Sequence, residues 1–141
     1  MQKVVFHGTD GKSEVLTSPE RLKTLFTRDN FDYWKRGTGD AEIMMYVNGD
    51  PVASIIIGTD WEYGFYLHYS DETNGDIYLS LHDHDRLHEV VEMPNEWLAS
   101  KGLFLPPDEA WEAIYDFIQT GKPSNRIKWI TPEMIPEDGN C

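Results

Sequence analysis

The strongest constraint on the fold is a succession of short apolar runs joined by tight polar turns. Residues 42–47 and 52–57 flank an Asn-Gly pair, which favours a two-residue hairpin turn. In residues 61–69 and 76–82, apolar and polar side chains alternate, as in strands that bury one face. The connections are too short for a crossover between parallel strands, so the four runs predict an antiparallel meander.

Further elements are predicted on both sides of the meander. Residues 3–7 and 13–16 are typical of another hairpin, and 126–130 of a last strand. A Ser-Pro start predicts a short helix at 19–27, and apolar side chains spaced three and four apart predict a helix at 107–119. The expected fold class is therefore α+β, an antiparallel β-sheet (a meander of about five to six strands) packed with an N-terminal short helix and a C-terminal amphipathic helix.

The remaining segments are less regular. Residues 83–102 fit a short strand near 89–93 and a turn of helix near 95–99. Residues 132–141 are rich in proline and glycine and predict a loose tail. A length of 141 residues is typical of one domain, so we expect residues 1–141 to fold as a single unit.

The acidic residues are concentrated in one part of the chain. The sequence has 25 Asp and Glu against 12 Lys and Arg, a net charge of −13. Residues 60–116 carry 14 of the acids and two of the bases, whereas residues 1–59 carry eight and seven. Such a field repels nucleic acid and anionic lipid and attracts basic proteins. Acidic surfaces also keep cytosolic proteins in solution, so the charge alone leaves both roles open.

The expected compartment is the cytoplasm. Cys141 is the one cysteine, so no intramolecular disulfide is possible. The N-terminal residues contain no long apolar stretch typical of a signal peptide. The longest apolar run, residues 55–57, is far too short to span a bilayer.

The best catalytic candidate is the histidine-rich segment 82–88. His82, His84 and His88 could bind zinc or iron, with His68 joining them from a neighbouring strand. Their spacing matches no established metal signature, and the sequence contains no nucleophile or phosphate-binding motif. We therefore expect a protein that is not an enzyme and needs no cofactor, and keep a small metal-dependent enzyme as an alternative.

Several short motifs occur along the chain in an order that can be compared with known families. S-P-E-x-L occupies residues 18–22 and M-Y-V-N-G-D residues 45–50. L-P-P-D-E-A-W-E-A-I-Y-D-F-I-x-T-G-K-P follows at 105–123, then I-K-W at 127–129. Across roughly residues 18–130 the chain resembles the type 1 immunity-protein family of bacterial polymorphic-toxin and contact-dependent inhibition systems. The terminal helix with its T-G-K-P end, followed by the Trp-containing strand, is the most specific part.

The resemblance implies a cytoplasmic antidote. It would bind a cognate toxin C-terminal domain, often a nuclease or nucleic-acid deaminase, and cover its active site or substrate groove. The family has no shared catalytic residues to carry over. An α+β domain of 141 residues can be a monomer, so we expect a monomer in a 1:1 complex. Two segments depart from the family pattern, residues 1–16 and 82–88.

The charge distribution predicts where the basic partner binds. Toxins that act on nucleic acids carry basic grooves, and an acidic inhibitor associates with them quickly by electrostatic steering. An adaptor for a different basic protein remains the second interpretation. The predicted partner-binding residues are the acids Glu62, Asp71, Glu72, Asp76, Asp83, Asp85 and Glu89, with Tyr66 and Tyr78 as aromatic anchors.

Overall fold

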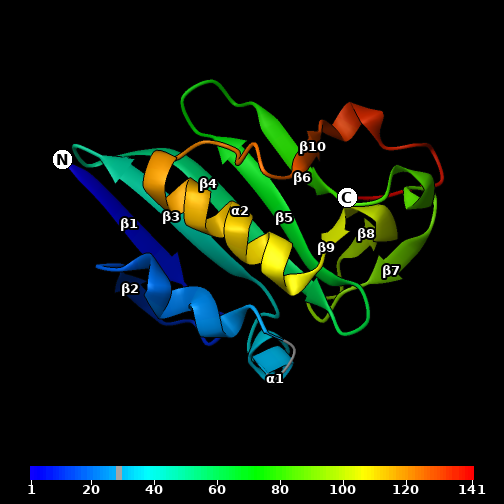
Figure 1. Ribbon diagram of the computed structural model, residues 1–141, viewed down its shortest axis with the longest axis horizontal. Helices are drawn as coiled ribbons and strands as arrows, with labels where there is room; N and C mark the ends of the chain where they lie inside the picture. The colour runs from blue at the N-terminus through cyan, green and yellow to red at the C-terminus, as the bar shows by residue number, and fades with distance from the viewer. Residues whose placement is uncertain (28–29) are drawn as a thin grey trace.

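One antiparallel sheet dominates the computed structural model, which describes residues 1–27 and 30–141 (Figure 1). In these residues the strand order is β10-β6-β5-β4-β3-β1-β2, and β9 also pairs with β5. The strands are β1 (Gln2–His7), β2 (Ser13–Val15), β3 (Ala41–Val47), β4 (Asp50–Asp60), β5 (Gly64–Asp71), β6 (Ile77–Leu81), β9 (Phe104–Leu105) and β10 (Lys128–Ile130). The predicted α+β class and the meander from β3 to β6 are confirmed.

Helices cover one face of this sheet, which we call the front face. Helix α2 (Pro107–Thr120) lies across it, beside the 3-10 helix η1 (Pro19–Leu25) and the short helix α1 (Phe31–Trp34) (Figure 1). Alternate residues of β5, from Phe65 to Tyr69, point into the same core as the apolar side of α2, from Ala110 to Ile118. No helix among the described residues is both long enough and apolar enough to cross a bilayer.

The opposite, rear face of the sheet is covered over only part of its width. The covering layer contains β7 (Val90–Glu92), β8 (Leu98–Ser100) and the 3-10 helices η3 (His84–Arg86), η4 (Lys101–Leu103) and η5 (Pro132–Met134). It buries a second cluster that includes Tyr66 of β5 and Leu79 of β6. Met93 reaches β4 at Gly58, where an added Cβ would lie 2.6 Å from the methionine sulfur.

Strand β5 changes partner along one of its edges. Residues 68–70 pair with β6, whereas residues 65–66 pair with β9. Ser80 closes the junction: its buried hydroxyl accepts from the Leu67 N–H (3.0 Å) and donates to the Leu103 carbonyl (2.7 Å). Gly64 has φ +105°, and a Cβ there would lie 2.1 Å from the Leu105 carbonyl oxygen, so only glycine lets β9 approach.

Three predicted elements differ from the structure. Residues 61–63 form a turn instead of the start of a strand, because the Asp60 carboxylate accepts from the N–H groups of Glu62 and Tyr63 (2.9 and 3.1 Å). The predicted helix at 19–27 is a 3-10 helix, and Ser18 makes no side-chain cap hydrogen bond. The predicted turn of helix at 95–99 is instead a turn leading into β8.

The expectation of a loose tail at 132–141 is wrong. The Ser100 N–H donates to the Asn140 carbonyl (2.7 Å), and the Asn140 N–H donates to the Ser100 hydroxyl (2.9 Å). Cys141 packs against the second cluster. Hydrogen bonding to β8 therefore holds in place a segment that its proline and glycine content alone predicted to be loose.

Candidate functional site

The predicted acidic surface is divided between the two ends of β5. Eight residues at about 3.3 Å each separate these ends by about 25 Å. The first group, at the end of β5 near Asp71, is Asp71, Glu72 and Asp76 with Tyr78. The second group, at the other end, is Glu62, Asp83, Asp85 and Glu89. Strand β6 runs back toward the β4–β5 turn, and the segment after β6 brings Arg86 over the Tyr63 ring there.

The second group, at the end of β5 beside the β4–β5 turn, contains charges of both signs. Glu89 forms ion pairs with Arg86 (3.2 Å) and Lys101 (3.6 Å), and both cations lie over the Tyr63 ring. A hydrogen bond from the Arg86 guanidinium lowers the pKa of Glu89. Asp83 caps η3 by accepting from the Asp85 N–H. Glu89 and Asp83 therefore have partners inside the molecule and are poorly suited to attract an external cation.

The end of β5 near Asp71 contains a groove of about 470 Å³ with aromatic and acidic walls. We call it the hairpin-end groove, formed by Tyr69, Asp71, Asp76, Tyr78, Lys122, Pro123 and Trp129. Tyr78 also lines a second hollow of about 320 Å³, to which the C-terminal segment contributes Glu133.

The aromatic walls of this groove are positioned by the sheet. Tyr69 and Tyr78 are register partners with ring centroids 6.1 Å apart, and Trp129 meets Tyr69 edge-on at 6.4 Å. The Tyr69 hydroxyl donates to the carbonyl of Gly121 (2.9 Å), which ends α2 in a left-handed conformation. Burial, with a smaller contribution from Asp71, raises the pKa of Tyr69 to about 12, so it remains a donor at neutral pH.

A polar cluster fixes the segment that carries Lys122 and Trp129. The Asp116 carboxylate of α2 accepts from Arg126 Nε (2.9 Å), Arg126 Nη2 (2.8 Å) and the Ser124 hydroxyl (2.5 Å). The hydrogen bonds from Arg126 lower the pKa of Asp116. The indole N–H of Trp129 donates to the Ser124 carbonyl (2.8 Å), so this wall of the groove is tied to the helix.

Hydrogen bonds lower the pKa of two acids at the hairpin end, Asp71 and Glu133. Asp71 accepts from the Thr73 hydroxyl (2.6 Å) and the Thr73 N–H (2.9 Å), which lowers its pKa. A hydrogen bond from the Thr131 side chain lowers the pKa of Glu133 in the same way. Asp71, Asp76 and Glu133 line the two hollows at this end, and Lys122 is the one lysine or arginine among their lining residues, so the hollows carry excess negative charge at neutral pH.

Sequence reasoning missed Glu133 and misplaced Tyr66. Glu133 lies in the segment expected to be loose, and no local pattern brings it to β6. The prediction of Tyr66 as an exposed anchor is wrong, because it is 3% exposed and its ring packs beside Phe104 under the rear layer. Burial raises its pKa well above the usual tyrosine value. Tyr78 remains partly exposed.

The histidines do not assemble. His82, His84 and His88 are exposed, and His82 Nδ1 lies 3.9 Å from a Glu109 carboxylate oxygen. His68 lies on the rear side of β5, where burial lowers its pKa. In the described part of the chain, no three His, Cys, Asp or Glu side chains are grouped to hold a metal ion. The geometry therefore gives the metal-enzyme alternative no support.

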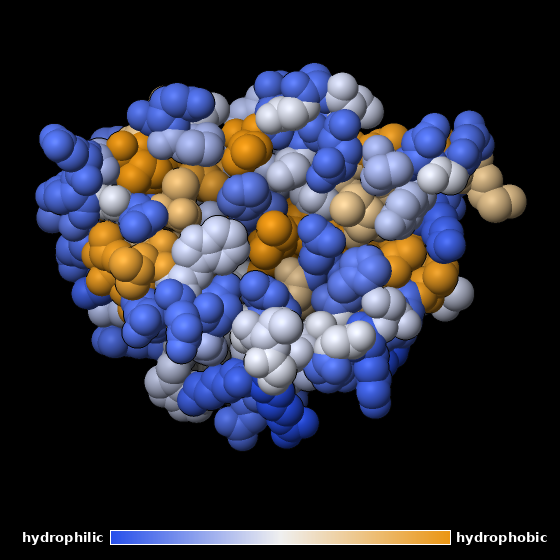
Figure 2. Space-filling view, turned by 180° about the vertical axis from the view of Figure 1, so that it is seen from behind, coloured by the Kyte–Doolittle hydropathy of each residue, from blue (hydrophilic) through white to orange (hydrophobic). Residues whose placement is uncertain are grey.

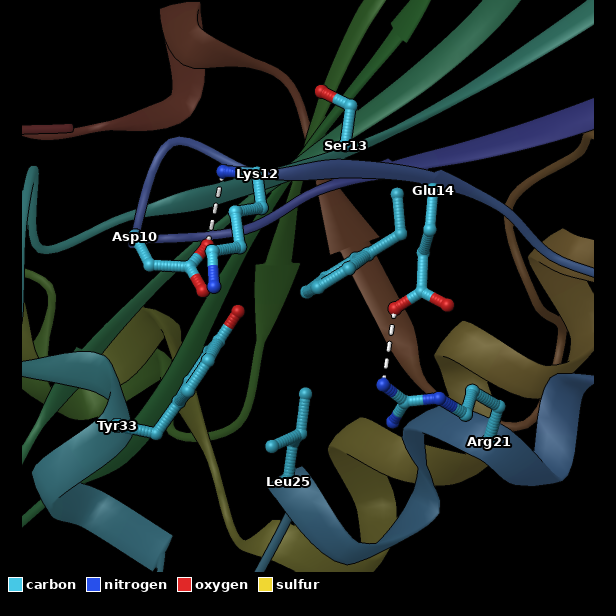
Figure 3. Close-up of a pocket in the computed structure, with 8 residues that line it drawn as sticks. Asp10, Lys12, Ser13, Glu14, Arg21, Leu25 and Tyr33 are labelled. Atoms are coloured by element: carbon cyan, nitrogen blue, oxygen red, sulfur yellow. Dashed lines mark hydrogen bonds and ion pairs between the residues drawn. The ribbon is translucent and has the colours of Figure 1, made fainter.

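A further hollow of about 380 Å³ lies between the N-terminal hairpin and the first two helices (Figure 3). Its lining includes the apolar side chains of Phe6 and Leu25, and Arg21 and Glu14 form an ion pair of 3.2 Å beside them. Asp10 accepts from the Lys12 backbone N–H (3.0 Å). Acids and bases are balanced here, so this hollow lacks the excess charge of the hairpin-end groove.

The comparisons with known proteins give no relative. No protein-family model, no curated protein and no solved structure matches the chain. The resemblance to the type 1 immunity proteins therefore remains a prediction from the motifs, and the hairpin-end groove is the feature on which a functional proposal rests.

Proposed function

We propose that this protein is an immunity protein that neutralises a basic toxin domain by direct binding, with the hairpin-end groove as its acidic contact surface. The observation that carries the proposal is the convergence at one end of the sheet of Asp71, Asp76 and Glu133 around Tyr78 and Trp129. As part of the same proposal, it acts in the cytoplasm as a monomer that forms a 1:1 complex.

The groove fits an arginine or lysine side chain of the partner. A cation between Tyr78 and Trp129 gains about 0.5–2 kcal/mol from an aromatic face, depending on its desolvation. Asp71 and Asp76 add charge-assisted hydrogen bonds, the stronger class in proteins. A nuclease or deaminase exposes such cations in its substrate groove, so an inhibitor bound there competes with nucleic acid.

Association kinetics test the proposal. The probe is the inactivated C-terminal domain encoded by the neighbouring upstream gene, and the variant is Asp76→Lys with Glu133→Lys. We expect the association rate to fall at least about tenfold at low salt, because steering depends on exposed charge. We also expect a weaker salt dependence and loss of protection when the active toxin is co-expressed.

The matched control reverses two acids at the other end of β5, Asp83→Lys with Asp85→Lys. This variant changes the net charge by the same amount, and we expect it to keep most of the association rate. Equal losses for both variants would show that only total charge matters, and the groove would lose its role. A wild-type protein that neither binds nor protects would overturn the immunity proposal in favour of an adaptor for another basic protein.

A further inference from the structure

The edge strand β10 pairs with only part of β6. Its last pair joins Ile130 to Leu79, and in the described part of the chain no strand lies beside residues 77–78 on this edge. The next hydrogen-bonded pair would join Ile77 to Pro132, which has no N–H to donate. The chain turns away into η5 instead, and the second hollow at the hairpin end lies between the two segments. We call it the β6-edge hollow, formed by residues 75–78 and 131–133.

The backbone of Ile77 faces the open edge. The Asp71 N–H donates to the Asp76 carbonyl (2.8 Å), so the peptide groups of Asp76 point toward β5. Because the N–H and C=O groups of successive residues point to opposite edges of an antiparallel strand, those of Ile77 point away from β5. Among the described residues, none donates a hydrogen bond to the Ile77 carbonyl at this edge. The β6-edge hollow therefore contains a backbone acceptor that is available to a ligand.

Two carboxylates accompany this acceptor, one from each side of the hollow. Asp76 comes directly before β6, and Glu133 lies in η5. The turn that carries Glu133 is fixed by a hydrogen bond from the Met134 N–H to the Thr131 carbonyl (3.0 Å). The hairpin-end groove contains Lys122, whereas no Lys, Arg or His is among the described residues that line the β6-edge hollow. The negative charge of this hollow is therefore not balanced by a cation of its own.

This arrangement of acceptors fits a guanidinium group. Its five N–H donors lie in one plane in fixed directions, so it can donate to acceptors on both sides of the hollow at once. The ring of Tyr78 also lines the hollow, and a guanidinium stacks on an aromatic face. A lysine ammonium has all its donors on one atom and cannot match this geometry. A metal ion fits less well, because no third His, Cys, Asp or Glu joins the two carboxylates in the described part of the chain.

Seen from behind, the molecule presents hydrophobic side chains in separate patches bordered by hydrophilic ones (Figure 2). A partner that meets this mixed surface is selected by sites where several polar groups converge. We propose that the β6-edge hollow is a subsite for an arginine side chain of the basic toxin domain and selects arginine over lysine. The inference rests on the proposed function for the source of this arginine. It adds which cation is recognised, beside the groove that shares Asp76 and Tyr78 with the hollow.

Short peptides test the subsite without the toxin domain. The probes are acetyl-Gly-Arg-Gly-amide and acetyl-Gly-Lys-Gly-amide, which carry the same charge. Each is titrated into the ¹⁵N-labelled protein up to about 20 mM, because single side chains bind in the millimolar range. We expect saturable shifts of the Tyr78 and Glu133 amides and an affinity for the arginine peptide at least about fivefold above that for the lysine peptide. The Tyr78 nitrogen shares a peptide group with the Ile77 carbonyl and so reports a hydrogen bond to that acceptor.

Equal affinities of the two peptides would overturn the proposal, as would the lack of a saturable shift at residues 75–78 and 131–133. The test variant is Glu133→Gln, which we expect to reduce the preference for arginine at least about threefold. Its matched control is Glu137→Gln, which removes the same charge from an exposed acid of the same C-terminal segment. The control should keep the wild-type preference. Equal losses for both variants would show that the peptide senses only total charge.

The inactivated toxin domain distinguishes this inference from the proposed function. In the complex with the wild type, the amides of Tyr78 and Glu133 should shift, and Glu133→Gln should raise the dissociation rate at least about threefold. If the toxin domain binds without shifts at the β6-edge hollow, the proposed function stands and the arginine subsite is wrong. If the arginine peptide binds there but the toxin domain does not bind, the subsite stands and the immunity function is wrong.

Discussion

At the scale of single residues, Ser80 shows how one hydroxyl decides where strands separate. Its side chain is fully buried and joins β5 to the segment before β9 through two hydrogen bonds. We expect Ser80→Ala to lower the free energy of unfolding by about 1–3 kcal/mol, because it leaves the Leu67 N–H and the Leu103 carbonyl buried without partners. Urea denaturation followed by circular dichroism measures this loss.

Ser18 provides the matched control for that experiment. It precedes η1, but unlike Ser80 it is exposed, and its side chain makes no cap hydrogen bond. Ser18→Ala should therefore change the free energy of unfolding by less than about 0.5 kcal/mol. Similar losses for both substitutions would contradict the role given to the Ser80 hydroxyl.

At the scale of elements, the connection between α2 and β10 depends on the ionisation of Asp116. The folded-state pKa of this carboxyl is lowered, so its contribution is complete above the ordinary aspartate pKa and is lost as the pH falls through the folded value. We expect Asp116→Asn to destabilise the fold by about 1 kcal/mol at pH 7, after allowing for solvent screening. The difference from the wild type should stay constant down to about pH 5 and shrink below it.

Urea titrations at a series of pH values measure this difference. The control is Glu14→Gln, which removes an exposed pair with a single contact to Arg21 (3.2 Å). That substitution should cost less than about 0.5 kcal/mol at any pH. A loss for Asp116→Asn that is the same at pH 7 and pH 3 would show that the ionised carboxylate is not the stabilising species.

The strands and the last helix were predictable because their signals are local. Alternation gave β6 and most of β5, and the Asn-Gly turn gave β3 and β4. Alternation cannot show whether the second face of a strand is covered, which is why Tyr66 was expected to be exposed. The arrival of β9 beside β5 and of Glu133 beside β6 depends on contacts across more than 35 residues, which no local pattern encodes.

At the scale of the whole molecule, the negative charge is distributed unevenly because several cations are used internally. Arg86 and Lys101 pair with Glu89, and Arg126 pairs with Asp116. These cations hold the rear layer and the last connection in place. At the hairpin end, Asp71, Asp76 and Glu133 line hollows in which Lys122 is the one lysine or arginine, so the unbalanced charge lies there.

The half-covered sheet also determines how the sequence can diverge. Along β1 and β3 only every second residue is held in a core, whereas residues 64–67 of β5 are buried on both sides. A saturation mutagenesis scan for folding should therefore show tolerance with a period of two along β1 and β3, and uniform intolerance at the start of β5. The positions free to vary are those that face outward. Substitutions there can therefore change the rear surface of the sheet while the core residues that determine the fold stay the same.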